Sequence, residues 1–130
     1  MIVCDASAVA EILLARPRAD RMRAALAGEA AVHVPEHFHV ELLSVLRRYA
    51  LRGELGDRRA AEARRALADL RAIRYPVLEL ADTIWELRAT LTAYDAAYLA
   101  LARRLDAPLL TLDRALADAA AAEDRLARRD

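Results

Sequence analysis

Four acidic residues of this sequence occupy positions from which their carboxylates could act together: Asp5, Glu41, Asp95 and Asp113. The first and the last follow or end short apolar runs, at residues 2–4 and 108–112. The second lies among apolar residues of a predicted helix, and the third lies near the start of another. Because the four come from separate predicted elements, a sheet with helices around it could bring them to one edge.

Carboxylates that meet in this way repel one another. Two like charges about 4 Å apart cost roughly 4 kcal/mol at an effective dielectric constant near 20, so the group shares protons or binds a cation. Ligands that are all oxygen favour hard cations, which makes Mg²⁺ the expected ion, with Mn²⁺ as the alternative. Such an ion suits phosphodiester hydrolysis, because it orients the phosphate, neutralises charge and supplies a water nucleophile.

Each of these residues also has a purely structural interpretation. Asp5 and Asp113 stand where the N-caps of the following helices would be, and Thr92-x-x-Asp95 has the form of a capping box. Glu41, like most helical glutamates, could face solvent. No single position therefore distinguishes a structural role from a functional one. The set of four, in this order along the chain, favours a functional site.

The elements that would position these residues alternate between short apolar runs and helical patterns. Predicted strands cover residues 2–5, 31–34, 76–80 and 108–112. Helices are predicted from Ser7 to Pro17, over 18–27 and 36–52, from an Asp57 N-cap through Ile73, around Ile84–Leu87, from a Thr92 N-cap, and over the tail 114–130. This alternation predicts an α/β fold, in which functional groups collect at the carboxyl ends of parallel strands.

Composition narrows the class of protein. The 130 residues suffice for one domain, and 57% hydrophobic with 31% charged residues is typical of a globular protein. Twenty basic residues, all arginine, balance 20 acidic ones, so net charge gives no argument for nucleic-acid binding. With a single cysteine, no signal peptide and no long apolar run, we expect a cytoplasmic protein without membrane contact or internal disulfide.

Several segments resemble the PIN-domain family, and its VapC toxin branch closely. The resemblance extends from Met1 to about Ala117. Its most specific part is the block Thr-Ala-Tyr-Asp-Ala-Ala-Tyr at residues 92–98, and the opening Val-x-Asp-Ala-Ser is moderately specific. The other matching segments are residues 34–48, around Glu41, and residues 108–113, which end at Asp113.

The resemblance implies a three-layer α/β/α sandwich with a short parallel sheet of four to five strands, spanning residues 1–130 as one domain. It implies a Mg²⁺-dependent endoribonuclease in which Asp5 and Asp95 are the principal metal ligands. Glu41 and Asp113 would complete the acidic cluster, and the hydroxyls of Ser7 and Thr111 would support it. The implied partners are an RNA substrate, a cognate antitoxin and a second copy of the toxin. The tail from about residue 118 lacks the apolar closing strand of many relatives, which leaves the sheet edge open.

Two other functions stay open from the residues alone. One is a PIN-like module that binds RNA or protein without catalysis, and the other is a different α/β metal phosphohydrolase that acts on small phosphate esters. The histidines are interpreted as loop or surface groups rather than ligands or bases: His33, His37 and His39. The clustered arginines are interpreted as solvated helix faces, with phosphate contact as the alternative: Arg47, Arg48, Arg52, Arg64, Arg65, Arg71 and Arg74.

Overall fold

A four-stranded parallel sheet forms the centre of the structure, a computed structural model that describes residues 1–128. The strands lie in the order β3-β2-β1-β4, and each neighbouring pair is parallel. Their bounds are β1 (Val3–Cys4), β2 (Val32–Pro35), β3 (Ala72–Tyr75) and β4 (Leu109–Leu110). The predicted parallel sheet is confirmed, with strands shorter than the apolar runs that indicated them.

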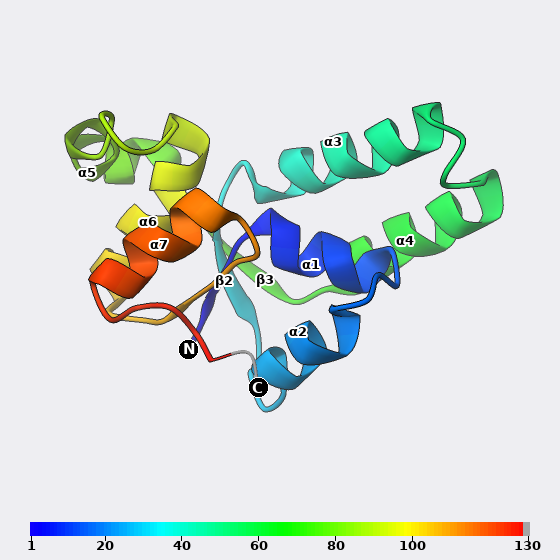
Figure 1. Cartoon of the computed structure of the whole chain (residues 1–130), viewed down its shortest axis with the longest axis horizontal. Coiled ribbons are helices and arrows are strands. Elements are labelled where there is room, and N and C mark those ends of the chain that lie inside the picture. The colour runs from blue at the N-terminus through cyan, green and yellow to red at the C-terminus, as the bar shows by residue number, and fades with distance from the viewer. Residues whose placement is uncertain (129–130) are drawn as a thin grey trace.

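Helices cover both faces of this sheet (Figure 1). On one side lie α1 (Ala6–Leu13), α2 (Ala19–Leu26), α3 (Phe38–Leu51) and α4 (Asp57–Asp69). On the other side lie α5 (Ala81–Glu86), α6 (Ala93–Leu105) and α7 (Arg114–Ala122), with the short 3₁₀ helix η1 (Val77–Leu80) before α5. The three-layer α/β/α arrangement is therefore the one expected. None of the helices in residues 1–128 combines the length and apolar character that a membrane crossing needs.

Helix α6 packs directly on the sheet and supplies much of the core. Seven consecutive residues, 96–102, are buried, and four of them are alanines. Small side chains let this helix approach β1 and β2 closely, and Tyr98 fills the remaining space with no exposed surface. A helix buried on nearly all sides is a core helix, so the position of Asp95 in its first turn is fixed by the packing behind it.

The predicted strand at residues 76–80 is wrong. The third strand is β3, four residues earlier, and residues 77–80 form η1, in which only Leu80 is buried. Ile73, which the sequence pattern assigned to the preceding helix, lies instead in β3 and is 47% exposed. As an edge strand, β3 has no continuous apolar run, whereas Val77–Leu80 has one but begins after a proline that cannot donate to a ladder.

Two further expectations need correction. Asp57 is the first residue of α4 rather than its N-cap; Gly56 takes that place, and no side chain of the described residues caps the helix there. Arg71 and Arg74 lie before and within β3, not on a helix.

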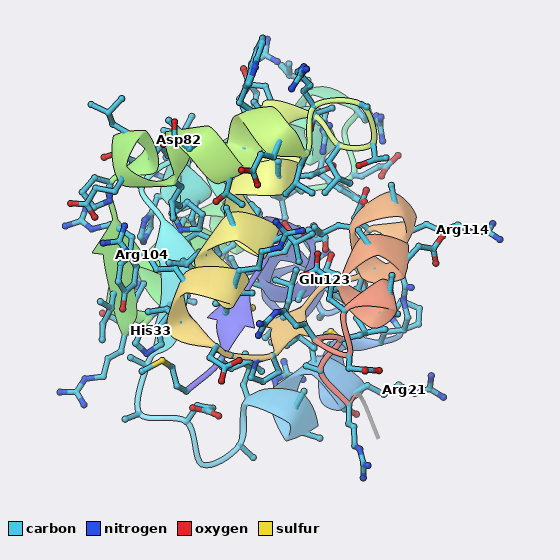
Figure 2. All side chains as sticks on the ribbon, turned by 90° about the vertical axis from the view of Figure 1, so that its left-hand side faces the viewer. Arg21, His33, Asp82, Arg104, Arg114 and Glu123 are labelled. Carbon is cyan, nitrogen blue, oxygen red and sulfur yellow. The ribbon has the colours of Figure 1, made fainter. Side chains whose placement is uncertain are left out.

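The sequence predicted a helix over the whole tail, residues 114–130, and this prediction is wrong beyond α7. The helix ends at Ala122, and Leu126 then forms an isolated parallel bridge with Leu109 at the β4 edge; residues 129–130 lie outside the described part. Glu123 faces α6 while Arg114 points away from the molecule (Figure 2). Arg103 Nε donates to both carboxylate oxygens of Glu123 at 3.0 Å, which fastens α7 to α6.

Candidate active site

The candidate site lies where two neighbouring strands send the chain to opposite faces of the sheet. After β1 the chain enters α1 on one side, and after β4 it enters α7 on the other (Figure 1). At such a switch point a crevice opens beyond the carboxyl ends of the strands. Cys4 is paired with Leu110, so Asp5 and Thr111 are the next residues on each side. The fold therefore places the end of each strand at this crevice.

Asp5 is held by two hydroxyl groups. Its Oδ2 accepts hydrogen bonds from Ser7 Oγ at 2.8 Å and from Thr111 Oγ1 at 2.6 Å. Each hydroxyl in turn accepts a backbone N–H from the loop after β4: Leu112 N donates to Ser7 Oγ at 2.9 Å, and Asp113 N donates to Thr111 Oγ1 at 3.0 Å. The two hydroxyls thus connect the Asp5 carboxylate to the loop that carries Asp113.

Burial governs the electrostatics of Asp5, whose residue is only 4% exposed. Loss of hydration raises its pKa above the ordinary value, and the charge of Glu41 adds to this effect. The hydrogen bonds from Thr111 and Ser7 act in the opposite direction, because they stabilise the ionised form. Asp5 is therefore a carboxylate whose charge is costly and calls for a positive partner.

The capping interpretations hold for two positions and not for the third. Thr92 Oγ1 accepts from Asp95 N at 3.2 Å, and Asp113 Oδ1 accepts from Leu116 N at 2.9 Å. Asp5 occupies the N-cap position of α1, but its side chain makes no capping bond within the described residues. Asp113 therefore caps α7 and also lines the cavity, whereas the side chain of Asp5 lines the cavity without capping α1.

Glu41 faces the crevice rather than solvent. Its Oε1 accepts a hydrogen bond from Tyr98 OH at 2.6 Å and lies 3.0 Å from His37 Nε2. His37 Nε2 also lies 3.1 Å from the Tyr94 carbonyl oxygen. Burial alone would lower the pKa of His37, but the bond to Glu41 and its charge prevail and raise it. The His37 ring and the Tyr98 phenol therefore both hold the same oxygen of this carboxylate.

A cavity of about 600 Å³ brings the four predicted acids together. It is lined by Asp5, Ala6, Ser7, Val40, Glu41, Ser44, Val45, Arg48, Tyr94, Asp95 and Asp113. Burial and then the charges of Asp113, Asp5 and Glu41 raise the pKa of Asp95 to about 6. The acids come from the β1–α1 junction, α3, α6 and the β4–α7 loop, so the expected juxtaposition of distant segments is present.

The carboxylates surround the cavity without closing on one point. Within residues 1–128, no group of three or more His, Cys, Asp or Glu side chains is arranged so that it could hold an ion by itself. Mg²⁺, however, keeps several waters and is often bound through only one or two carboxylates. The donor set is all oxygen, and burial together with the charges of neighbouring carboxylates makes the ionised form of Asp95 costly, which a cation would relieve. The residues fit a hydrated hard cation.

Sequence reasoning missed the residues behind the carboxylates. Among the histidines, His37 was assigned to the surface, yet it contacts Glu41; its only signal was the spacing of four residues on a helix. Tyr98, on α6, contacts Glu41, in the first turn of α3, across 57 positions of the chain. His33 bonds instead to Tyr75 OH at 2.8 Å, between β2 and β3, and His39 does not line the cavity.

Comparisons with known proteins identify the relatives of this chain. The PIN domain family profile matches residues 2–122. Ribonuclease VapC9 of Mycobacterium tuberculosis is 45% identical over 126 residues, which cover 95% of this chain and 94% of the relative. Ribonuclease VapC12 of the same organism is 37% identical over 117 residues, 90% of each chain.

Two crystal structures share the fold. VapC20 of Mycobacterium tuberculosis, a toxin that cleaves the sarcin-ricin loop, matches with a TM-score of 0.74 at 19% identity over the whole of both chains. PAE2754 from Pyrobaculum aerophilum matches with a TM-score of 0.65 at 23% identity, over 90% of this chain and 77% of the other. The chain belongs to the PIN domain family and, within it, to the VapC ribonucleases.

Proposed function

We propose that this protein is a Mg²⁺-dependent endoribonuclease that hydrolyses RNA phosphodiester bonds as the toxin of a toxin–antitoxin pair. The observation that carries the proposal is the cavity lined by Asp5, Glu41, Asp95 and Asp113. It is supported by the likeness to ribonuclease VapC9 over nearly the whole of both chains. The family match over residues 2–122 also supports our proposal that residues 1–130 form a single domain.

Asp5 and Asp95 are the proposed principal ligands of the metal, with Mn²⁺ as an alternative occupant, and Glu41 and Asp113 complete the acidic surround. A divalent ion bound there supplies positive charge to the phosphate oxygens and activates water for attack. Burial and then the charges of the neighbouring carboxylates raise the pKa of Asp95, which supports an ion at this place, since a divalent charge offsets the carboxylates that line the same cavity.

The protein's own groups keep these carboxylates in position. Ser7 and Thr111 fix one oxygen of Asp5, so its second oxygen has a defined direction. Tyr98 and His37 both contact Glu41 Oε1, which leaves Oε2 as the oxygen available to the cavity. Carboxylates held in advance need no reorganisation when substrate binds, and this is the largest contribution that a fixed site makes to catalysis.

Three partners belong to the proposal: an RNA substrate, a cognate antitoxin and a second copy of this chain. The names of the relatives support the first, since they are described as ribonucleases. The description of VapC20 as a toxin supports the second by fold alone. The proposal predicts that the purified protein forms a homodimer and binds the product of an adjoining reading frame.

The proposal is tested by Asp5→Asn. The substitution keeps the size of the side chain but removes its charge, so we expect metal-dependent cleavage of single-stranded RNA to fall at least a hundredfold. The matched control is Asp118→Asn on the exposed side of α7, which lines neither this cavity nor another described one and should leave cleavage unchanged.

Circular dichroism and thermal unfolding establish that both variants are folded. If folded Asp5→Asn cleaves RNA as fast as the parent protein, the carboxylate cavity is not the active site. If the parent protein binds RNA without cleaving it under Mg²⁺ or Mn²⁺, a non-catalytic module is correct. Faster hydrolysis of nucleotides than of RNA would identify a phosphohydrolase of small esters instead.

A further inference from the structure

A second cavity, of about 320 Å³, continues the first along α1 and α3. The two share four lining residues: Ser7, Val45, Arg48 and Asp113. They therefore form one groove, which we call the α1–α3 groove. Its first part carries the four carboxylates, and its second part carries three arginines, Arg16, Arg18 and Arg48.

The charges of the second part do not cancel. Its buried Glu11 is already paired: Oε1 accepts from Arg18 N at 3.0 Å and from Arg18 Nε at 3.3 Å, and Oε2 lies 3.7 Å from Arg16 Nε. The other acid is Asp113, one of whose oxygens caps α7. Glu11 thus pairs with two of the three arginines themselves, and three guanidinium groups against two carboxylates leave the second part of the groove net positive.

Arg48 is the group at the junction, since it lines both cavities. It is exposed, and within residues 1–128 no carboxylate lies within ion-pair distance of it. A guanidinium in a groove presents a planar fork of donors that matches the oxygens of a phosphate. Arg48 is therefore free to bind an anion that enters beside the carboxylates.

Two contacts, with Tyr49 and with Glu11, hold the Arg16 side chain in place. Its guanidinium carbon lies 5.5 Å from the centre of the Tyr49 ring, and Tyr49 is the next residue after Arg48 on α3. The contact with the ring and the pairing with Glu11 restrict the side chain to the groove. Less conformational entropy is lost when such a restricted side chain binds a ligand.

We infer that the α1–α3 groove is the track of a single RNA strand, and that Arg48 and Arg16 bind the phosphate next to the one at the carboxylates. This inference rests on the proposed function, and it specifies the path that the RNA strand takes away from the carboxylates. A polynucleotide carries phosphates at regular intervals. One phosphate can therefore lie at the carboxylate-lined first part of the groove while the next phosphate lies at the arginines of the second part. An acidic peptide would fit the arginines but gain nothing from the adjoining carboxylates, so RNA is the favoured occupant.

The test compares two substrates of different length. A dinucleotide has one phosphodiester and no neighbouring phosphate, whereas an octanucleotide extends along the groove. We expect Arg48→Gln to lower kcat/KM for the octanucleotide about tenfold, mainly through KM, and to leave the dinucleotide unchanged. Arg16→Gln should act in the same direction. Arg47→Gln is the matched control, because Arg47 is an exposed neighbour on α3 that lines neither cavity.

A binding measurement gives a second readout that does not depend on cleavage. Each phosphate contact to a single strand contributes about 0.7 to the slope of log K against log salt concentration. Arg48→Gln should therefore weaken octanucleotide binding in EDTA and reduce this slope by about 0.7, while Arg47→Gln should change neither. Thermal unfolding checks that the variants remain folded.

The outcomes separate the inference from the proposed function. If the parent protein cleaves RNA and Arg48→Gln loses equally on both substrates, or on neither, the inference is overturned and the proposed function stands. If the parent protein cleaves neither substrate, the proposed function fails, and unchanged octanucleotide binding by Arg48→Gln overturns the inference as well. If Arg48→Gln weakens the binding of an acidic peptide but not of RNA, the groove binds protein and the inference is wrong.

Discussion

Asp5 and Thr111 are 106 positions apart, yet Thr111 Oγ1 donates a 2.6 Å hydrogen bond to Asp5 Oδ2. The pairing of Cys4 with Leu110 in neighbouring parallel strands brings these two residues side by side. The same hydroxyl accepts the N–H of Asp113 at 3.0 Å. One buried side chain thus connects the Asp5 carboxylate to the backbone of Asp113, another of the four acidic residues that line the cavity.

Thr111→Val should damage both stability and cleavage. The substitution preserves the shape of the side chain but removes a donor to a carboxylate and an acceptor for a backbone N–H, which we expect to cost about 3 kcal/mol. With Ser7 as its one remaining hydroxyl partner, Asp5 loses its fixed direction, and kcat should fall about tenfold or more. Urea unfolding and RNA cleavage measure the two effects.

Thr111→Ser serves as the control for that experiment, since it keeps the hydroxyl and removes one methyl group. It should cost about 1 kcal/mol of stability and leave kcat within a few-fold of the parent protein. If Ser and Val at this position reduce kcat equally, the hydroxyl does not position Asp5.

Mn²⁺ should raise the melting temperature of the parent protein. A ligand that binds only the folded state stabilises it by about 2.7 kcal/mol at a hundred times its Kd. The raised pKa of Asp95 indicates a site in which a cation relieves repulsion, so Asp95→Asn should reduce the shift, and Asp118→Asn should not. An equal Mn²⁺ shift in all three proteins would mean that the ion binds elsewhere.

The apolar runs revealed β1 and β4, because both strands are buried and their sequences are continuously apolar. They failed at β3, where Ile73 and Arg74 are both exposed on an edge strand. An apolar run reports burial, so it does not reveal the partly exposed β3, although it does reveal β4, which is buried at the other edge of the sheet.

Two of the acidic residues could be found from the sequence because they lie just beyond buried strands. The other two stand out by their places in predicted helices, and the family resemblance supports the whole set of four. Their supports could not all be found. The bond between Glu41 and Tyr98 depends on how α3 and α6 meet, and no local pattern encodes that contact. The α1–α3 groove likewise depends on Arg16, between α1 and α2, and Arg48, on α3, reaching the same cavity.

Tyr98→Phe should weaken cleavage without unfolding the protein. It removes a 2.6 Å hydrogen bond to Glu41 Oε1, which we expect to cost about 1–2 kcal/mol and to lower kcat several-fold. Tyr75→Phe is the matched control, since it also loses one hydroxyl bond to a neighbour, His33, but lies away from the cavity. Equal kcat values for the two variants would show that the phenol does not orient Glu41.

Glu123→Gln should lower stability at neutral pH but not in acid. The hydrogen bonds from Arg103 lower the pKa of Glu123 below its ordinary 4.5. A lowered pKa gives stability that is present above pH 4.5 and is lost as the pH falls further. Because the pair is partly exposed, we expect the free energy of unfolding to differ from that of the parent protein by at most about 1 kcal/mol at pH 7.

Urea unfolding at pH 7 and pH 3 measures this difference. An equal difference at both pH values would contradict an ionic contribution.

Asp95→Asn should make the metal-free protein more stable at neutral pH. In the folded state the pKa of Asp95 is raised from 3.8 to about 6, so the folded protein holds this proton more tightly than the unfolded chain. Its contribution to stability is therefore complete below pH 3.8 and is lost as the pH rises through about 6. Solvent screening of this partly exposed carboxylate limits the effect to about 1 kcal/mol.

Unfolding in EDTA at pH 4 and pH 7.5 measures the effect. Relative to the parent protein, Asp95→Asn should be more stable at the higher pH, whereas Asp118→Asn should match the stability of the parent protein at both. An advantage of Asp95→Asn that does not grow with pH would mean that the neighbouring carboxylates do not raise the pKa of Asp95.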